Sequence, residues 1–250
     1  MRAAIVIPAR YDSKRLPGKP LMKDGHGKAM IQYVWEAAGR VSSVNRVIVA
    51  TDDERIRKAV LAFGGEVRMT SAGHRCGSDR VAEVAADLDH DVVVNLQGDE
   101  PAIPPEAITQ TVNLLAEDAE CVIGTLAVKI ESEEELADPN AVKVVVDNAW
   151  RALYFSRSPI PHVRDTATPL ADSPTPHLLH VGIYAYRREF LLRFASLPPH
   201  PLEQAERLEQ LRALAHGYRI KVALTPHRPM KVDTPEDFRV FCDFTSRTGS

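Results

Sequence analysis

The stretch Ile5-Val-Ile-Pro-Ala-Arg10, continued by Ser13-Lys-Arg-Leu-Pro-Gly-Lys-Pro20, is an apolar run that leads straight into a loop rich in cations and prolines. The β-branched residues predict a buried strand, and the prolines exclude a helix from the loop. The four cations of this segment are Arg10, Lys14, Arg15 and Lys19. Because arginine and lysine suit phosphate oxygens, the loop is predicted to bind a polyphosphate; a solvated basic loop is the alternative.

The composition is that of a globular protein in which the loop is locally basic, while the chain as a whole is not basic. It has 250 residues, of which 44% are hydrophobic and 26% are charged, enough for one large α/β domain. The net charge of -3 and the pI near 6.3 argue against nucleic acid as a partner. The three cysteines, which are Cys76, Cys121 and Cys242, lack zinc spacing and are expected to be reduced.

No apolar run reaches the roughly 18 residues of a membrane span. Met1-Arg2 leads directly into the first predicted strand, without the features of a signal peptide. We therefore expect a cytoplasmic protein with no membrane insertion.

The first half of the chain alternates between β-rich runs and amphipathic helical patterns. Strands are predicted over Ala3–Ile7, Val47–Thr51 and Val92–Leu96, and helices over about Met30–Val41, Asp53–Phe63 and Ser78–Leu88. This alternation predicts a mostly parallel sheet. Val92-Val-Val94 lacks polar alternation, as expected for a central strand. The basic loop and the turn Gln97-Gly-Asp-Glu100 should then share the carboxyl edge of the sheet, where ligands gather.

The second half is less regular and predicts strands that pair antiparallel. Strands are expected over Cys121–Val128, Val142–Val146, Ala152–Phe155, Val181–Tyr186 and Ile220–Leu224, and helices from a capping box at Ser132, near Glu203–His216 and after Thr234. The proline-rich segment 158–176 is either a lid or a dimer arm. We expect a single domain, 1–250, with a nucleotide-binding half (about 1–118), an antiparallel or dimerisation sub-region (about 119–200) and a return to the main sheet (about 201–250).

Two acidic positions are candidates for metal binding. Asp99 stands in the turn after the predicted central strand, and Asp233 stands just before the last predicted helix. A turn-capping or helix-start carboxylate is the alternative for each. Two separated carboxylates plus phosphate oxygens would suit Mg²⁺, although the sequence does not show that they meet. The basic loop is not a Walker A segment, since Pro20 follows Lys19, and the dinucleotide fingerprint fails at Met30.

Seven blocks, in order along nearly the whole chain, resemble the family of 3-deoxy-manno-octulosonate (Kdo) cytidylyltransferases, or CMP-Kdo synthetases. They are Pro8–Pro20, Asn95–Pro101, Asn140–Val144, Tyr154–Arg157, His180–Tyr184, Leu208–Arg212 and Val232–Asp237. The resemblance implies an α/β, Rossmann-like nucleotidyltransferase domain with a mostly parallel, mixed sheet. It also implies transfer of CMP from CTP to the C2 hydroxyl of Kdo, with release of pyrophosphate, for lipopolysaccharide biosynthesis. Mg²⁺ and a homodimer are further implications.

The resemblance assigns site residues by matching position. Ala9, Arg10, Arg15 and Lys19 would hold the triphosphate; Gly77, Ser78 and Asp79 the cytosine and ribose; Gln97, Arg157, His180, Tyr184, Glu209 and Gln210 the acid sugar; and Asp99 and Asp233 the metal. Of these, Asp99, Asp233, Arg15 and Lys19 would be catalytic. The pattern alone fits other roles as well. Tyr184 is at least as well explained by packing in a strand, and His180 by a hydrogen-bonded histidine at a strand end. Glu209 and Gln210 fit the solvated face of a helix. Ser78 replaces the family's frequent threonine, and Lys231 its common glycine.

The implied chemistry is direct in-line attack of the C2 hydroxyl on the α-phosphorus of CTP, without a protein nucleophile. No histidine or glutamate is required as a general base. A related enzyme acting on 8-amino-8-deoxy-Kdo or on a sialic acid is one alternative. A non-catalytic nucleotide-binding protein is more remote, because both acids are present. A sugar transferase is disfavoured, since Asp99 does not belong to a DxD pair.

Overall fold

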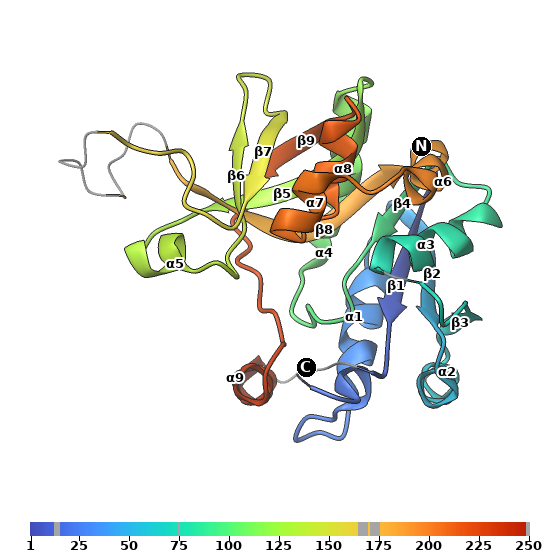
Figure 1. The fold of residues 1–250 in the computed structure, drawn as a ribbon. Coiled ribbons are helices and arrows are strands. Elements are labelled where there is room, and N and C mark those ends of the chain that lie inside the picture. Colours follow the sequence, from blue (N-terminus) through green and yellow to red (C-terminus); the bar gives the residue numbers. More distant parts are fainter. Residues whose placement is uncertain (13–15, 75, 165–169, 171–175, 249–250) are drawn as a thin grey trace.

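One mixed β-sheet with helices on both faces forms the centre of the protein (Figure 1). The computed structural model describes residues 1–250 except 13–15, 75, 165–169, 171–175 and 249–250. In the first half, the strands are β1 (Ala3–Ala9), β2 (Val44–Thr51), β3 (Glu66–Met69) and β4 (Val92–Asn95). They lie in the order β3-β2-β1-β4 and are all parallel, as the alternating pattern predicted.

The second half adds strands that run in both directions. Its strands are β5 (Cys121–Lys129), β6 (Lys143–Val146), β7 (Ala152–Ser156), β8 (Leu178–Arg187) and β9 (Arg219–Leu224). β8 pairs antiparallel with both β4 and β5, and β9 is parallel to β5. β6 and β7 form an antiparallel pair that joins the sheet through β8. The prediction of a mostly parallel, mixed sheet with an antiparallel sub-region is therefore confirmed.

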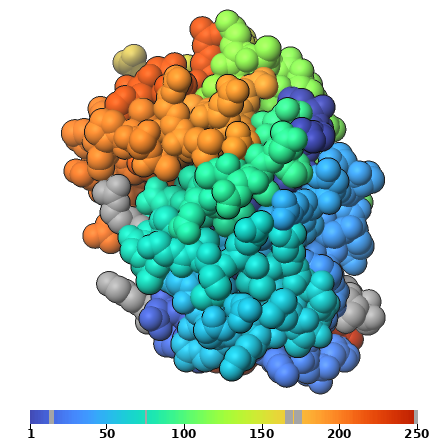
Figure 2. All heavy atoms as spheres, turned by 90° about the vertical axis from the view of Figure 1, so that its right-hand side faces the viewer, coloured from blue at the N-terminus to red at the C-terminus, as the bar shows by residue number. Residues whose placement is uncertain are grey.

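Helices cover both faces of the sheet because β1 is apolar on both sides. Ile5 and Ile7 pack in one core cluster, while Val6 packs in the cluster on the opposite face. The helices of the first face are α1 (Met30–Gly39), α2 (Glu54–Ala62) and α4 (Pro105–Glu117), and those of the second are α3 (Gly77–Ala86), α6 (Arg188–Ser196) and α8 (Gln210–Ala215). Figure 2 shows α6 lying directly against α3, so the two halves share a continuous core.

Several elements of the structure differ from the predicted ones. The helix expected near Glu203–His216 is two helices, α7 (Pro201–Glu206) and α8, because Arg207 adopts a left-handed conformation with φ 53° and caps α7 through Glu203 O. The helix α4 was not predicted; it begins at Pro105, with Pro104 as its N-cap, and Pro105 is a start signal that does not depend on periodicity. The edge strand β3 is short and half-charged, and α6 follows β8 without an intervening loop.

The last helix, α9 (Pro235–Thr248), returns the chain to the first half of the molecule (Figure 1). Its predicted start is confirmed, since Asp237 N donates to Thr234 Oγ1 at 3.2 Å. Phe241 packs edge-on against Tyr33 of α1, with ring centroids 5.2 Å apart. Val232 N donates to Asp99 O at 2.9 Å, so the segment before α9 is bonded to the turn after β4.

The segment 158–176, expected to be a lid or a dimer arm, lies largely outside the described residues. The remaining short helices are η1 (Lys19–Leu21) and α5 (Glu133–Ala137), and α5 begins at the predicted Ser132 cap. Within the described ranges, no helix is both long enough and apolar enough to cross a membrane.

Candidate active site

Lys19, Asp99 and Asp233 meet at the carboxyl edge of the sheet, although they are far apart in the chain. Lys19 Nζ lies 3.0 Å from Asp99 Oδ2 and 3.1 Å from Asp233 Oδ1. The parallel neighbours β1 and β4 place Lys19 and Asp99 at the same edge, as predicted. The segment before α9 then brings Asp233 to them, which the sequence did not show. These three side chains, here called the acid–lysine cluster, are between 12% and 20% exposed.

The acid–lysine cluster has donor atoms that suit a divalent cation. Asp99 Oδ1 is buried and has no hydrogen-bond partner among the described residues, so it is available as a ligand. Carboxylate oxygens are the ligands that Mg²⁺ prefers, and Mg²⁺ commonly takes few protein ligands. Within the described part of the chain, no group of three or more His, Cys, Asp or Glu side chains could hold a metal ion. Phosphate oxygens of a substrate would therefore have to complete the coordination by Asp99 and Asp233.

Two neighbouring residues shape this cluster. A Cβ atom at Gly98 would lie 3.1 Å from Pro8 O, so the absence of a side chain allows the turn to pack against the end of β1. The close approach at Gly98 is therefore to backbone. Lys231 Nζ lies 3.7 Å from Asp233 Oδ2, with the side chain 54% exposed. This departure from the family pattern therefore adds a cation beside the proposed metal ligand.

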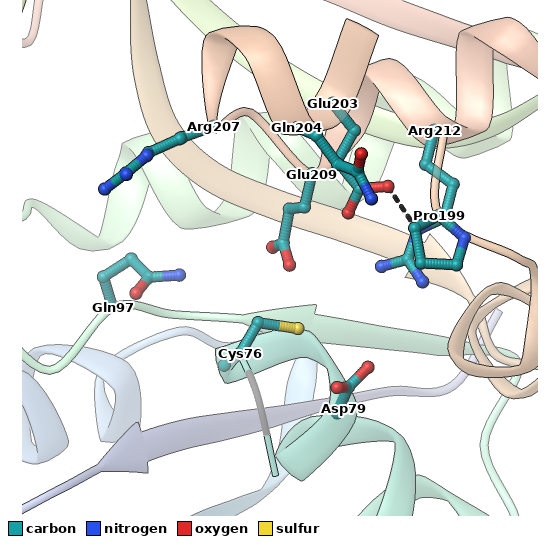
Figure 3. A pocket seen from close by; sticks show the side chains of 10 residues that line it. Cys76, Asp79, Gln97, Pro199, Glu203, Gln204, Arg207, Glu209 and Arg212 are labelled. Atoms are coloured by element: carbon teal, nitrogen blue, oxygen red, sulfur yellow. Dashed lines mark ion pairs between the residues drawn. The ribbon is translucent and has the colours of Figure 1, made fainter. Parts of the chain in front are cut away.

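A cavity of about 490 Å³ opens next to this edge (Figure 3). One wall comes from Cys76 and the first residues of α3, and the opposite wall from α7 and α8. Four residues assigned by the resemblance line it, namely Gly77, Asp79, Gln97 and Glu209. Figure 3 shows Glu209 pointing across the cavity toward Cys76, and Gln97 extending along its floor. The structure thus brings together residues assigned to the nucleotide and residues assigned to the sugar.

A buried hydrogen-bonded chain joins the two walls. Ser78 Oγ donates to Glu209 Oε1 at 2.5 Å and accepts from Asn95 Nδ2 at 3.2 Å. Ser78 is fully buried, so its hydroxyl, assigned to the cytosine and ribose, is engaged inside the protein. Burial raises the pKa of the Glu209 carboxyl, and the Ser78 hydrogen bond opposes that rise. Glu209 is therefore held in place, which the helix-face alternative did not anticipate.

Arg212 also lines the cavity, on the side of α7 and α8 (Figure 3). It is 3% exposed, and its Nε lies 3.3 Å from Glu203 Oε2. Its guanidinium also stacks 4.3 Å from the Phe194 ring centroid and donates to Leu197 O at 3.2 Å. Sequence reasoning did not assign Arg212 a role, although its position on the apolar stripe of Leu208 and Leu211 was a usable signal. A charged residue on such a stripe is usually buried with a partner.

His180 and Tyr184 lie on β8, where they form part of an aromatic row. Their ring centroids are 5.3 Å apart, and His180 Nε2 is 3.0 Å from Thr125 Oγ1. Burial, with a smaller contribution from Lys231, lowers the pKa of His180 to about 3, so the ring is neutral at physiological pH. Tyr184 is 6% exposed and packs in a core cluster. Neither residue lines the described cavity.

The other assigned residues have internal partners or lie elsewhere. Arg157 donates from Nε to Glu206 O at 2.7 Å and from Nη1 to Pro139 O at 2.8 Å, and it does not line the cavity. Arg10 donates to His74 O, and Ala9 is buried at the end of β1. Gln210 is 2% exposed, and its Nε2 has no partner among the described residues. Arg15 lies outside the described residues.

Glu100 is a further buried acid that sequence reasoning missed. It is 4% exposed, and burial, followed by the charge of Asp99, raises the pKa of its carboxyl to about 7. The available signal was an acid directly after Asp99 in the same turn.

The lowered pKa of His180 predicts an acid sensitivity of the fold. Because the pKa is about 3 when folded and about 6.5 when unfolded, the neutral ring favours the fold above pH 6.5, and this contribution is lost as the pH falls toward 3. Between pH 6.5 and 5, His180 should lower the free energy of unfolding by about 2 kcal/mol. Urea denaturation of His180→Gln should show a correspondingly flatter pH dependence. His26→Gln, at an exposed ring, should match the wild type, and equal slopes for all three proteins would contradict the prediction.

Comparisons with known proteins agree with this geometry. The chain is 50% identical over 252 residues to the 3-deoxy-manno-octulosonate cytidylyltransferase of Geobacter metallireducens, with 99% of each chain covered. It is 52% identical over 242 residues to the protein of the same name from Geotalea uraniireducens, with 95% of this chain and 96% of that protein covered.

Solved structures show the same relationship. A CMP:2-keto-3-deoxy-manno-octonic acid synthetase complexed with CTP superposes with a TM-score of 0.92 at 44% identity, covering 99% of this chain and 100% of that one. The 4-diphosphocytidyl-2C-methyl-D-erythritol synthase of Anaerococcus prevotii, at 15% identity and a TM-score of 0.63, shares the fold alone. A cytidylyltransferase family model matches residues 4–220. With its site residues at the sheet edge and relatives of this likeness along its whole length, the chain belongs to the cytidylyltransferases, within the group named for 3-deoxy-manno-octulosonate.

Proposed function

We propose that this protein transfers CMP from CTP to the C2 hydroxyl of Kdo and releases pyrophosphate, as a step in lipopolysaccharide biosynthesis. The observation that carries the proposal is the acid–lysine cluster, in which Lys19 lies between Asp99 and Asp233. The cluster is next to the described cavity, since Gln97 lines that cavity two residues before Asp99. Full-length relatives at 50% identity carry the corresponding name.

The nucleotide end of the site is supplied by the edge formed by β1 and α3. Lys19 is the described cation best placed for the phosphates, because its ammonium already lies beside two carboxylates at this edge. Arg10 and Arg15 are proposed to contribute further charge to the triphosphate. Asp99 and Asp233 would hold Mg²⁺. When bound, the ion would neutralise phosphate charge and lower the pKa of a nearby hydroxyl.

The reaction itself needs no covalent intermediate on the protein. The C2 hydroxyl oxygen attacks the α-phosphorus in line and a new O–P bond forms. The bond from the α-phosphorus to the oxygen shared with the β-phosphorus breaks, pyrophosphate leaves, and the hydroxyl proton is released to solvent. Lys19 stabilises the charge that develops on the departing pyrophosphate. The remaining residues act by holding the two substrates in reach of each other, which is a large part of the acceleration available to such reactions.

The acid sugar is proposed to lie between α8 and β8. Gln97 and Glu209 present an amide and a carboxyl to the cavity and suit sugar hydroxyls. His180 is neutral, so it can donate or accept a hydrogen bond without adding charge. Arg157 uses two of its N–H groups on backbone carbonyls and retains others for the sugar carboxylate. Tyr184 and Gln210 complete the proposed sugar pocket.

Pyrophosphate release from CTP and Mg²⁺ tests the proposal directly. Kdo, 8-amino-8-deoxy-Kdo and sialic acid are compared as acceptors under the same conditions. Kdo should give the largest kcat/KM. A clear preference for one of the other two would reassign the acceptor, and no release with any acceptor would refute the activity.

We further propose a homodimer in the cytoplasm. The three cysteines are unpaired, as expected for a reducing compartment that also holds CTP. Leu153 on β7 is 62% exposed in the antiparallel sub-region, a position suited to a partner subunit. Sedimentation velocity should show a dimer that Leu153→Lys weakens, whereas Leu61→Lys, at an exposed leucine of α2, should leave it intact. A wild-type monomer at all working concentrations would refute the dimer.

A further inference from the structure

Glu100 has a buried carboxyl that the mechanism above does not use. It is 4% exposed, and its Oε2 has no hydrogen-bond partner among the described residues. Buried carboxylate oxygens in folded proteins nearly always have partners, and an unpaired one calls for an explanation. A position beside the active site suggests that the partner is part of a substrate.

The two consecutive acids of this turn are directed to different strands. Asp99 lies on the β1 side, where its Oδ2 contacts Lys19. Glu100 lies on the β8 side, where its Oε1 is 3.5 Å from the position that a Cβ atom would occupy at Gly182. This divergence follows from the sheet order, because β4 lies between β1 and β8.

The part of β8 that Glu100 faces extends beyond the end of β4. Asn95, the last residue of β4, pairs with Tyr184, so Gly182 and His180 lie past that end at the same edge as the turn. Alternation along β8 places Gly182 on the same face as His180 and Tyr184, and Tyr184 packs on that face with Tyr186. The missing side chain at Gly182 leaves room for the Glu100 carboxyl in a row otherwise filled by rings.

The chemistry of this position selects hydroxyl groups over phosphates. Oε2 of Glu100, which has no hydrogen-bond partner among the described residues, can accept a hydrogen bond from an O–H donor, while a phosphate would place negative charges together. Lys19, the cation proposed to bind phosphate, forms ion pairs with Asp99 and Asp233. It makes no contact with Glu100 in the described structure. The charge of Lys231 also reaches Glu100 and His180, so the β8 side of the turn holds a cation beside the carboxyl oxygen that has no hydrogen-bond partner among the described residues.

We infer that Glu100 is a specificity-determining residue that accepts hydrogen bonds from hydroxyl groups of the sugar acceptor, on the β8 side of the turn. The inference rests on the proposed function, because it assigns the acceptor half of the same site. Glu100 is not among the residues that the family resemblance assigns. In the structure its carboxyl lies opposite Gly182. The carboxyl selects an acceptor with a hydroxyl at one defined carbon and selects against its deoxy analogue.

The test compares the wild type with Glu100→Gln, a change of nearly equal size. Binding of Kdo to protein saturated with a non-hydrolysable CTP analogue is measured by calorimetry, and kcat/KM by pyrophosphate release. Glu100→Gln should weaken Kdo binding about tenfold, as expected for loss of a hydrogen bond to a buried carboxyl, with the CTP KM unchanged within about twofold. Glu106→Gln, at an exposed acid of α4, is the matched control and should change neither quantity.

Singly deoxygenated Kdo analogues, at C4, C5, C7 and C8, separate a substrate contact from a structural role. For the analogue that lacks the contacted hydroxyl, wild type and Glu100→Gln should bind equally, whereas the other analogues should keep the tenfold ratio. An equal ratio across all four analogues, or a tenfold loss of Mg²⁺ affinity in the variant, would overturn the inference. Wild-type protein that binds Kdo but releases no pyrophosphate would count against the proposed function alone.

Discussion

Asp99→Asn should lower kcat for pyrophosphate release by roughly a hundred- to a thousandfold while the protein stays folded. Asparagine keeps the size of the side chain and an oxygen that can accept from Lys19, so the turn after β4 retains its packing. The negative charge is lost, and with it the means of Asp99 to hold a divalent cation through its buried Oδ1. The measurement is kcat across a Mg²⁺ titration, with near-UV circular dichroism to verify the fold.

The control for Asp99→Asn is Asp89→Asn, the same chemical change at a side chain that is 93% exposed. It should leave the Mg²⁺ dependence and kcat unchanged. Near-normal turnover of Asp99→Asn at ordinary Mg²⁺ concentrations would remove Asp99 from the proposed metal site. Loss of the near-UV signal would instead indicate that the carboxylate is needed for folding.

Lys19→Met should reduce kcat/KM for CTP about ten- to a hundredfold, from the loss of charge-assisted bonding to phosphate. Methionine preserves much of the apolar stem, so packing beside η1 is retained. The same change also leaves Asp99 and Asp233 without the ammonium that lies 3.0 and 3.1 Å from them. Two facing carboxylates repel, so the variant should have a lower Tm without metal, and Mg²⁺ should raise that Tm more than in the wild type.

Lys23→Met provides the comparison, because Lys23 is exposed and close in sequence to Lys19. Its CTP kinetics and its Tm response to Mg²⁺ should equal those of the wild type. Unchanged CTP kinetics in Lys19→Met would place Lys19 outside the triphosphate site. A wild-type Tm for metal-free Lys19→Met would show that the ammonium is not needed to relieve the two acids.

The sequence predicted the elements whose pattern is local and strong. The apolar runs of β1 and β4 and the capping residues of α9 are confirmed nearly to the residue. The break between α7 and α8 was not predicted, because Arg207 has no sequence feature that favours a left-handed backbone. The edge strand β3 was missed for a related reason, since a half-charged run of four residues has no period that distinguishes it from loop.

In the candidate site, too, the sequence predicted some placements, and other contacts are seen only in the structure. Lys19 and Asp99 were placed at one edge from sequence, since both follow strands that were expected to be parallel. Arg157 was assigned to the sugar by its matching position in the family resemblance, and the structure shows in addition that it bonds to the carbonyls of Glu206 and Pro139. Ser78 was assigned to the nucleotide, yet it connects Asn95 with Glu209. Residue types indicate which contacts are possible, and packing selects among them.

The sequence alone determined the strands other than β3, the cationic loop after the first strand, and the acids that follow or precede ordered elements. Each of these depends on neighbours a few positions away. The meeting of Lys19 with Asp233, 214 residues later, depends on α9 packing against α1, and only the tertiary structure shows it. The same holds for the opposite directions of Asp99 and Glu100, which follow from the insertion of the reversed strand β8 beside β4. Long-range pairing decides such contacts, and no local pattern in the chain encodes it.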